Sequence, residues 1–171
     1  MRRKFEILGQ RPGAFTLVEA VVSLVVVGAM LVAALSTVGA SRLSQYKTSQ
    51  YSRGQLLAEL LMAEILTQDY LDPNGTPVFG TEGGESTSTR VDFDDVDDYD
   101  GWSSSPPAAK DGTPLAGLSG WQRSVTVQWV DPADVTQVKA SESNAKRVTV
   151  TVSCNNKQVG SLTAIKTDSG L

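Results

Sequence analysis

The stretch that decides the fold runs from Gly13 to Ala40 and reads GAFTLVEAVVSLVVVGAMLVAALSTVGA. It contains one acidic side chain, that of Glu19, and no basic side chain. No charged residue lies between Ala20 and Ser41. At a rise of about 1.5 Å per residue, roughly 21 helical residues span about 30 Å, the thickness of a bilayer's hydrocarbon core. Helices inside globular proteins rarely stay uncharged on every side for this length, so the stretch predicts a membrane-spanning helix.

The charges on the two sides of this stretch have opposite signs. The first fourteen residues carry four basic side chains and one acidic one, a net of +3, whereas the whole chain of 171 residues carries −4, which leaves −7 for the remainder. The positive-inside rule therefore predicts a cytoplasmic N-terminus and an exported region after Ala40. An acidic exported region has no electrostatic basis for binding nucleic acid. A removed secretory signal remains an alternative, because Val38-Gly39-Ala40 offers small residues, although the apolar run is long for one.

The composition excludes several common kinds of enzyme site. The chain has no histidine, so no Ser-His or Cys-His arrangement exists. Cys154 is the single cysteine, which rules out an intramolecular disulfide, and we expect it to be a passive residue at a strand end, out of phase with the neighbouring valines. There is no phosphate-binding glycine loop and no zinc motif. We therefore expect neither catalytic residues nor a cofactor.

The residues at the start of the apolar stretch form a more specific pattern. A basic leader is followed by the small residue Ala14, then by Phe-Thr-Leu-Val-Glu-Ala from Phe15 to Ala20, then by the apolar run. This combination resembles the processing signal of type IV pilins and pseudopilins, over roughly Arg11 to Ala40. In that family a prepilin peptidase cuts the leader on the cytoplasmic side. The new N-terminal residue is usually phenylalanine, becomes N-methylated, and has a glutamate four residues after it.

The resemblance implies a role for each matching residue. Cleavage after Ala14 makes Phe15 the methylated N-terminus and Glu19 the fifth mature residue. Glycine usually precedes the cut in this family, so cleavage between Gly13 and Ala14 is the alternative, although it would make Glu19 the sixth residue. An unpaired carboxylate in hydrocarbon is costly. The resemblance implies that Glu19 pairs with the N-terminal ammonium of a neighbouring subunit, where the low dielectric strengthens the attraction.

The helix is expected to continue beyond the membrane, as far as Leu71. No proline interrupts the chain from Ser41 to Leu71, and apolar residues recur there at steps of three and four. The sequence Asp-Pro-Asn-Gly at residues 72–75 should end the helix. The expected divisions are a cleaved leader (1–14), the transmembrane or assembly half of the helix (15–41), its amphipathic half (42–72) and an exported region of loops and strands (73–171).

Three later segments alternate apolar and polar residues, as strands with one buried face do. They are Trp121–Val130, Lys146–Cys154 and Gln158–Thr167, and Asn155-Asn156-Lys157 predicts a hairpin turn between the last two. Shorter strands are expected near Thr76–Phe79 and Ser88–Phe93. The predicted fold is α+β and pilin-like: a long N-terminal helix whose amphipathic half packs against a small antiparallel sheet.

An acidic cluster lies between the helix and these strands. Six aspartates occur between Asp92 and Asp100. Calcium is one interpretation, because such loops supply oxygen ligands, but an EF-hand register would put Val96 first and Pro107 last, which fails. Some major pseudopilins carry calcium in a C-terminal loop, and this stretch does not establish a match to it. The alternative is a solvated acidic turn whose apolar residues fold inward, namely Phe93, Val96, Tyr99 and Trp102. No metal ligand is assigned.

The function that this pattern predicts is structural. The chain is expected to be a minor pilin or pseudopilin of a type IV pilus or type II secretion filament, held in the inner membrane with its C-terminal region in the periplasm before assembly. The expected partners are the prepilin peptidase and N-methyltransferase, other pilin subunits, the inner-membrane assembly platform and lipid. The alternative is a binding module on a single uncleaved helix, with calcium as one candidate ligand.

Overall fold

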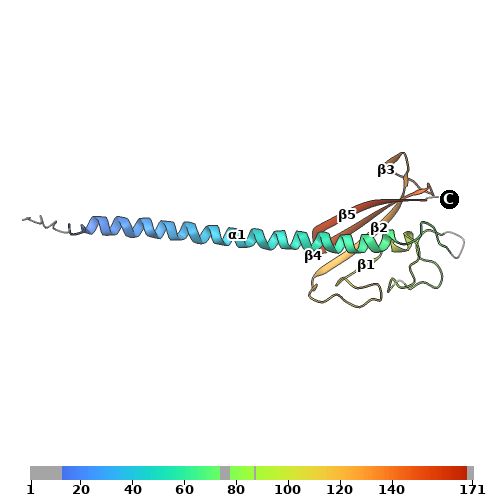
Figure 1. Cartoon of the computed structure of the whole chain (residues 1–171), viewed down its shortest axis with the longest axis horizontal. Coiled ribbons are helices and arrows are strands. Elements are labelled where there is room, and N and C mark those ends of the chain that lie inside the picture. Colours follow the sequence, from blue (N-terminus) through green and yellow to red (C-terminus); the bar gives the residue numbers. More distant parts are fainter. Residues whose placement is uncertain (1–12, 74–77, 87, 169–171) are drawn as a thin grey trace, which may run out of the picture. The chain divides into compact units, whose positions relative to one another are not determined.

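The computed structural model describes residues 13–73, 78–86 and 88–168 and has an α+β architecture (Figure 1). The predicted leader therefore lies outside the described residues as far as residue 12. The chain divides into two units between Gln45 and Tyr46, and one helix runs through this boundary. The elements in order are α1 (Leu17–Leu66), the short 3-10 helix η1 (Asp97–Tyr99), β1 (Ser103–Ser104), β2 (Trp121–Asp131), β3 (Asp134–Val138), β4 (Ala145–Cys154) and β5 (Lys157–Thr167).

The helix α1 is 50 residues long and ends at Leu66, before the predicted end at Leu71. The backbone of Asp69 bonds to the loop instead of continuing the helix. Its N–H donates to the carbonyl of Asp94, and its carbonyl accepts from the N–H of Val96. Carbonyl oxygens at and just after the end of the helix also accept hydrogen bonds from the sheet. Lys166 Nζ donates to Leu66 O at 3.1 Å and to Gln68 O at 3.0 Å. These contacts stop the helix before the proline does.

The three predicted strands are confirmed as β2, β4 and β5 of an antiparallel sheet with the order β1-β2-β4-β5. Val125 lies opposite Val150 and Val127 opposite Val148. The predicted turn between β4 and β5 is also confirmed. Asn155 and Asn156 take positive φ values of 50° and 62°, which asparagine tolerates better than most residues and which suit a two-residue hairpin.

The core lies between one face of this sheet and the second half of α1. The helix contributes buried residues at steps of three and four, and the strands contribute every second residue. The helix set is Leu57, Ala58, Leu61, Met62 and Ile65, and the central strand set is Val125, Val127, Val148, Val150 and Val152. Cys154 belongs to the same set and is 7% exposed, so the prediction that it lies out of phase is wrong.

A pair of glycines allows α1 to approach β5 closely. A Cβ added to Gly54 would lie 2.7 Å from the carbonyl oxygen of Val159, and one added to Gly160 would lie 2.6 Å from the carbonyl carbon of Gly54. Real side chains do not approach a backbone this closely, so larger residues would push the helix away from the strand. Gly54 is therefore a packing residue in this helix.

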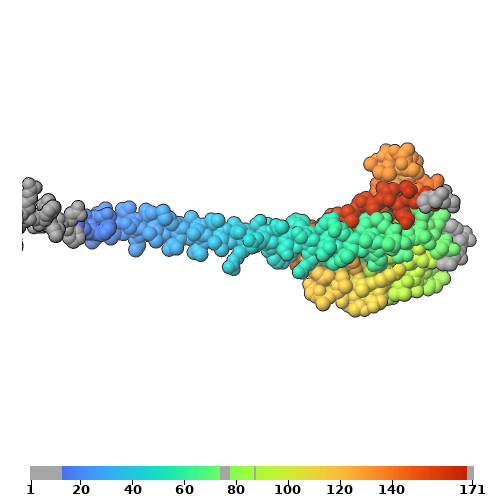
Figure 2. Space-filling view, viewed as in Figure 1, coloured from blue at the N-terminus to red at the C-terminus, as the bar shows by residue number. Residues whose placement is uncertain are grey.

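The remaining strand predictions are wrong. Val78, Phe79 and the described residues of 88–93 form turns and irregular chain, while Thr76 and Pro77 lie outside the described residues. The sheet instead gains two strands that the sequence did not predict, β1 and β3. All five residues of β3 are exposed, and Figure 2 shows it projecting at the edge of the C-terminal unit. A strand with no buried face lacks the alternation on which the prediction relied.

Candidate functional site

The predicted processing site lies in non-helical chain immediately before α1. Gly13, Ala14, Phe15 and Thr16 are exposed and precede the first helical residue, Leu17. The side chain of Phe15 is 79% exposed. A peptidase binds its substrate in extended form, so the Ala14–Phe15 peptide bond is placed where cleavage is sterically feasible. The alternative bond, Gly13–Ala14, lies in the same exposed segment.

Glu19 occupies the third position of α1, where it has a structural partner. Its backbone N–H donates to Thr16 Oγ1 at 3.2 Å, so Thr16 caps the helix. The spacing of Thr16 and Glu19 is that of a capping box, and a carboxylate in the first turn also interacts favourably with the helix dipole, by about 0.3–1 kcal/mol. This contribution is small beside the cost of placing an unpaired carboxylate in hydrocarbon. Glu19 is exposed and has room for an external cation.

The surface of α1 after Glu19 is apolar and uncovered. Its most hydrophobic 18-residue window has a mean hydropathy of 2.5, and none of that window is buried, so by length and composition α1 could cross a membrane. Soluble monomers rarely expose a contiguous apolar surface of this size. The exposed large side chains include Leu17, Val18, Val21, Val22, Leu24, Val25, Val26, Val27, Met30, Leu31, Val32, Leu35 and Val38.

Three of the six aspartates of the acidic cluster are buried, so the prediction of a solvated turn is wrong for these three, whereas Asp92 and Asp100 are exposed as expected. Asp95, Asp97 and Asp98 are 2%, 2% and 1% exposed. Asp95 Oδ1 accepts hydrogen bonds from the backbone N–H groups of Asp97 and Asp98 at 2.8 and 3.2 Å. Burial, together with the charges of Asp97 and Asp98, raises the pKa of Asp95 to about 8. The predicted inward packing is confirmed, since the buried core includes Phe93, Val96, Tyr99 and Trp102.

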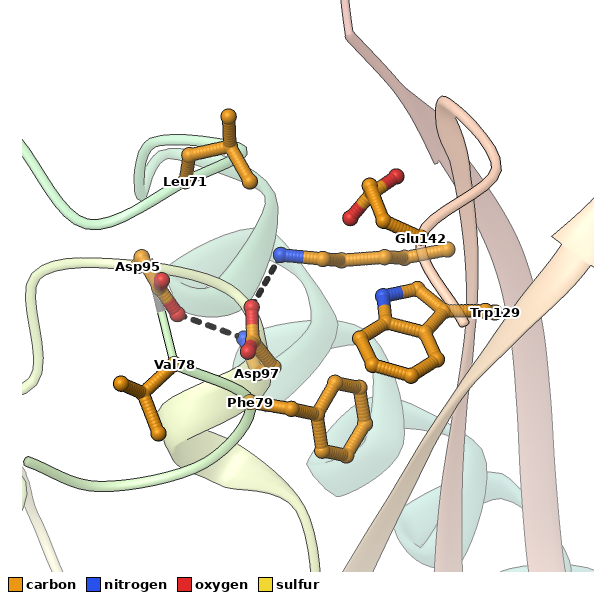
Figure 3. Close-up of a pocket in the computed structure, with 8 residues that line it drawn as sticks. Leu71, Val78, Phe79, Asp95, Asp97, Trp129 and Glu142 are labelled. Carbon is orange, nitrogen blue, oxygen red and sulfur yellow. Dashed lines mark hydrogen bonds and ion pairs between the residues drawn. The ribbon is translucent and has the colours of Figure 1, made fainter. Parts of the chain in front are cut away.

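Asp97 forms a buried ion pair with Lys146 at the wall of a cavity of about 150 Å³ (Figure 3). Lys146 Nζ also donates to the carbonyl oxygen of Tyr70, and its side chain is 1% exposed. Trp129, another wall residue, packs edge-on against Phe79 with ring centroids 4.6 Å apart. Its Nε1 has no hydrogen-bond partner within the described part of the chain. The ion pair joins the loop after α1 to strand β4.

A second ion pair, between a buried guanidinium and a partly exposed carboxylate, joins the same loop region to α1. Arg90 Nε and Nη2 donate to the two carboxylate oxygens of Glu64 at 2.8 and 3.1 Å. The guanidinium of Arg90 lies 4.2 Å from the ring centroid of Trp102, and Tyr99 donates its hydroxyl proton to Glu64 at 3.1 Å. Burial alone would raise the pKa of Glu64, but the hydrogen bonds and charge of Arg90 outweigh it, and the pKa is lowered.

A third group consists of carboxylates alone. Glu82, Glu85 and Asp98 each place a carboxylate oxygen within 4.8 Å of the others. Burial and the charge of Asp98 raise the pKa of Glu85 to about 7, and the same causes raise the pKa of Glu82. Only Asp98 belongs to the predicted acidic cluster. Glu82 and Glu85 come from a Gly-rich turn in which no sequence pattern predicts a site.

The structure thus holds two separate sets of candidate residues, one in each unit. Ala14, Phe15 and Glu19 lie at the start of α1, and the buried carboxylates lie in the loop region between α1 and β2. Comparisons of this chain with protein-family models, with curated proteins and with solved structures found no match.

Proposed function

We propose that this protein is a structural subunit of a pilus-type or secretion-type filament, processed at its N-terminus and assembled through α1. The observation that carries the proposal is a single carboxylate, Glu19, at the start of a long helix with an uncovered apolar surface. The Phe15-to-Glu19 spacing resembles that of type IV pilins and pseudopilins, and the α+β arrangement of a long N-terminal helix and a small antiparallel sheet is compatible with a pilin-like fold. Two environments suit the apolar surface: lipid before assembly, and other copies of the helix afterwards.

Cleavage supplies a cationic partner for the carboxylate of Glu19. Cutting the bond between Ala14 and Phe15 removes the basic leader and creates an ammonium group on Phe15. In a filament this ammonium and the Glu19 carboxylate of a neighbouring subunit would neutralise each other in a low-dielectric environment. An unpaired buried charge is strongly unfavourable, so only one axial register between subunits satisfies both groups. Glu19 therefore selects the register, and apolar contacts along α1 supply most of the association free energy.

The proposed partners follow from this route. A prepilin peptidase and N-methyltransferase processes the leader, an inner-membrane platform extracts the subunit from lipid, and other pilin-like subunits receive it. The acidic C-terminal unit lies outside the cytoplasmic membrane and is displayed on the filament surface. Nothing in this role needs catalysis or nucleic-acid binding.

A second candidate function is a binding module held by an uncleaved membrane helix. The convergence of Glu82, Glu85 and Asp98 favours it, because such a group suits a ligand in the exported unit. The two functions differ at the N-terminus. A tethered module retains Met1, whereas a filament subunit begins at Phe15.

The assembly role of Glu19 is tested by comparing Glu19→Ala with Glu59→Ala in cells that assemble the filament. Both substitutions remove one exposed glutamate from α1, but Glu59 lies in the amphipathic half. We expect both variants to insert into the membrane and to lose the leader normally. We expect only Glu19→Ala to remain in the membrane fraction and to be absent from sheared filaments. Incorporation of Glu19→Ala at the level of Glu59→Ala would exclude the proposed role.

A further inference from the structure

A tight turn holds two glutamates beside the first residues of η1. Glu85 N–H donates to the carbonyl oxygen of Glu82 at 3.3 Å, and Glu82 N–H donates to Glu85 Oε2 at 2.9 Å. Gly84 in this turn has a φ of 125°, a backbone conformation that residues other than glycine rarely adopt. The turn therefore fixes the two carboxylates on the same side of the chain.

Asp98 faces this turn, and one of its two carboxylate oxygens accepts no hydrogen bond from the described residues. Asp98 is 1% exposed, and its Oδ2 accepts the backbone N–H groups of Asp94 and Asp95 at 3.0 and 3.1 Å. Its Oδ1 is buried and has no hydrogen-bond partner among residues 13–73, 78–86 and 88–168. Glu82 Oε1 is likewise buried and has no hydrogen-bond partner among the described residues. Buried acceptors without partners are rare, and each one calls for a ligand or a water molecule.

No cation of the described chain pairs with these carboxylates. The ion pairs between described residues join Arg90 to Glu64, Lys139 to Asp131 and Lys146 to Asp97. Three ionised carboxylates whose oxygens lie within 4.8 Å of one another repel each other, and either a shared proton or a bound cation relieves that repulsion. The two glutamates are only partly buried, so an ion has a path from solvent.

We propose that Glu82, Glu85 and Asp98 form a calcium site. Carboxylate oxygens are the ligands that hard divalent cations prefer, and calcium accepts carboxylates in one- or two-oxygen coordination with irregular geometry, completed by water. Magnesium demands nearly ideal octahedral geometry and keeps most of its water, which suits a turn-mounted set of three carboxylates less well. The ion would join the Gly-rich turn to η1 and stabilise the loop region. The site does not depend on filament assembly, so it can be tested in the isolated subunit.

The test uses the full chain purified in detergent micelles and freed of metal with a chelator. Calcium binding is measured by titration calorimetry, and thermal unfolding is followed by circular dichroism with and without calcium. The test variant is Glu82→Gln with Glu85→Gln, and the matched control is Asp111→Asn with Asp134→Asn, which removes two fully exposed carboxylates elsewhere. Magnesium at equal concentration is the competing ion.

We expect the wild type and the control to bind one calcium per chain and to gain in Tm, with a smaller gain in magnesium. We expect the Glu82, Glu85 double variant to fold, to lose calcium binding and to have a Tm in chelator no lower than the wild type, because repulsion is removed. Glu85→Gln alone should weaken binding and provides a second readout if the double variant does not fold. Absence of saturable calcium binding by the wild type, or equal binding by the Glu82, Glu85 variants, would overturn the site.

Discussion

Buried cations hold the loop region between α1 and β2 in place. Lys146 reaches Asp97 from β4, Arg90 reaches Glu64 on α1, and Arg123 from β2 donates to the carbonyl oxygen of Ala108. All three cations are at most 4% exposed. A buried ion pair adds little net stability compared with well-packed apolar residues, but removing one partner leaves an uncompensated charge. These pairs therefore determine the loop conformation more than they determine its total stability.

Lys146→Met tests whether removing one partner of the buried Lys146–Asp97 ion pair destabilises the protein. The substitution keeps much of the side-chain volume but leaves Asp97 buried without its cation, so we expect a loss of about 3–5 kcal/mol in the free energy of unfolding. Adding Asp97→Asn removes the orphaned charge and should restore part of that loss. The free energy of unfolding of both variants is measured by urea denaturation of the full chain in detergent, with tryptophan fluorescence as the signal. A loss below about 1 kcal/mol for Lys146→Met would show that the pair is not buried as described.

Glu64 gives the stability a defined pH dependence. Its pKa in the folded state lies below the ordinary value of 4.5, so the folded protein binds fewer protons than the unfolded chain near that pH. The contribution of Glu64 is therefore complete above pH 4.5 and is lost as the pH falls through its lowered pKa. Glu64→Gln should unfold more easily at neutral pH and lose less further stability on acidification than the wild type.

The measurement is the Tm at several pH values, with Glu59→Gln as the control. Glu59 lies in the same helix but is exposed, and its carboxylate accepts a hydrogen bond from Gln55 at 3.2 Å. Its removal should leave the pH profile as in the wild type. Identical acid profiles for Glu64→Gln and the wild type would contradict the assigned role of Arg90.

The sequence contained part of this residue-level information. The alternation of Val148, Val150 and Val152, extended one step back, places Lys146 on the buried face, and the same step from Val125 reaches Arg123. Charged residues on a buried face predict buried partners, and six aspartates were available nearby. The sequence could not show which carboxylate each cation meets, because those pairs join segments distant in the chain through an irregular loop. Glu82 and Glu85 were overlooked for the same reason.

At the scale of elements, regular patterns predicted regular structure. The apolar run and the three alternating segments became α1, β2, β4 and β5, with errors of a few residues at their ends. The end of α1 was misplaced because the backbone of Asp69 bonds to Asp94 and Val96, a tertiary contact that local signals do not contain. The strands β1 and β3 were missed because each is short and neither has a buried face.

Gly54→Ala tests the close packing of α1 on β5. Alanine usually stabilises a helix interior by about 1 kcal/mol relative to glycine. Here the new Cβ would lie 2.7 Å from the backbone of Val159, so the helix and strand must separate, and we expect a net loss of about 1–3 kcal/mol. Gly39→Ala is the matched control, since a Cβ there meets nothing within 4 Å, and it should not destabilise the protein. Equal unfolding midpoints for the two variants would refute the close approach.

At the scale of the whole molecule, the chain combines a C-terminal unit that has its own hydrophobic core with an N-terminal helical segment whose apolar side chains are exposed. By length and composition α1 could cross a membrane, and membrane insertion followed by filament assembly is the route that we propose. The resemblance at residues 11–40 predicts the processing chemistry from sequence alone. The fold by itself does not predict this processing chemistry, because folds of this general class support many functions.

The most direct test is the mass of the N-terminal peptide of the protein in membrane fractions from cells with an active prepilin peptidase and from matched cells lacking it. The account predicts a peptide that begins with N-methylated Phe15 in the first case and one that retains the leader in the second. A chain that still carries residues 1–14 where the peptidase is active, or one cut after Ala40 as by a secretory signal peptidase, would contradict it.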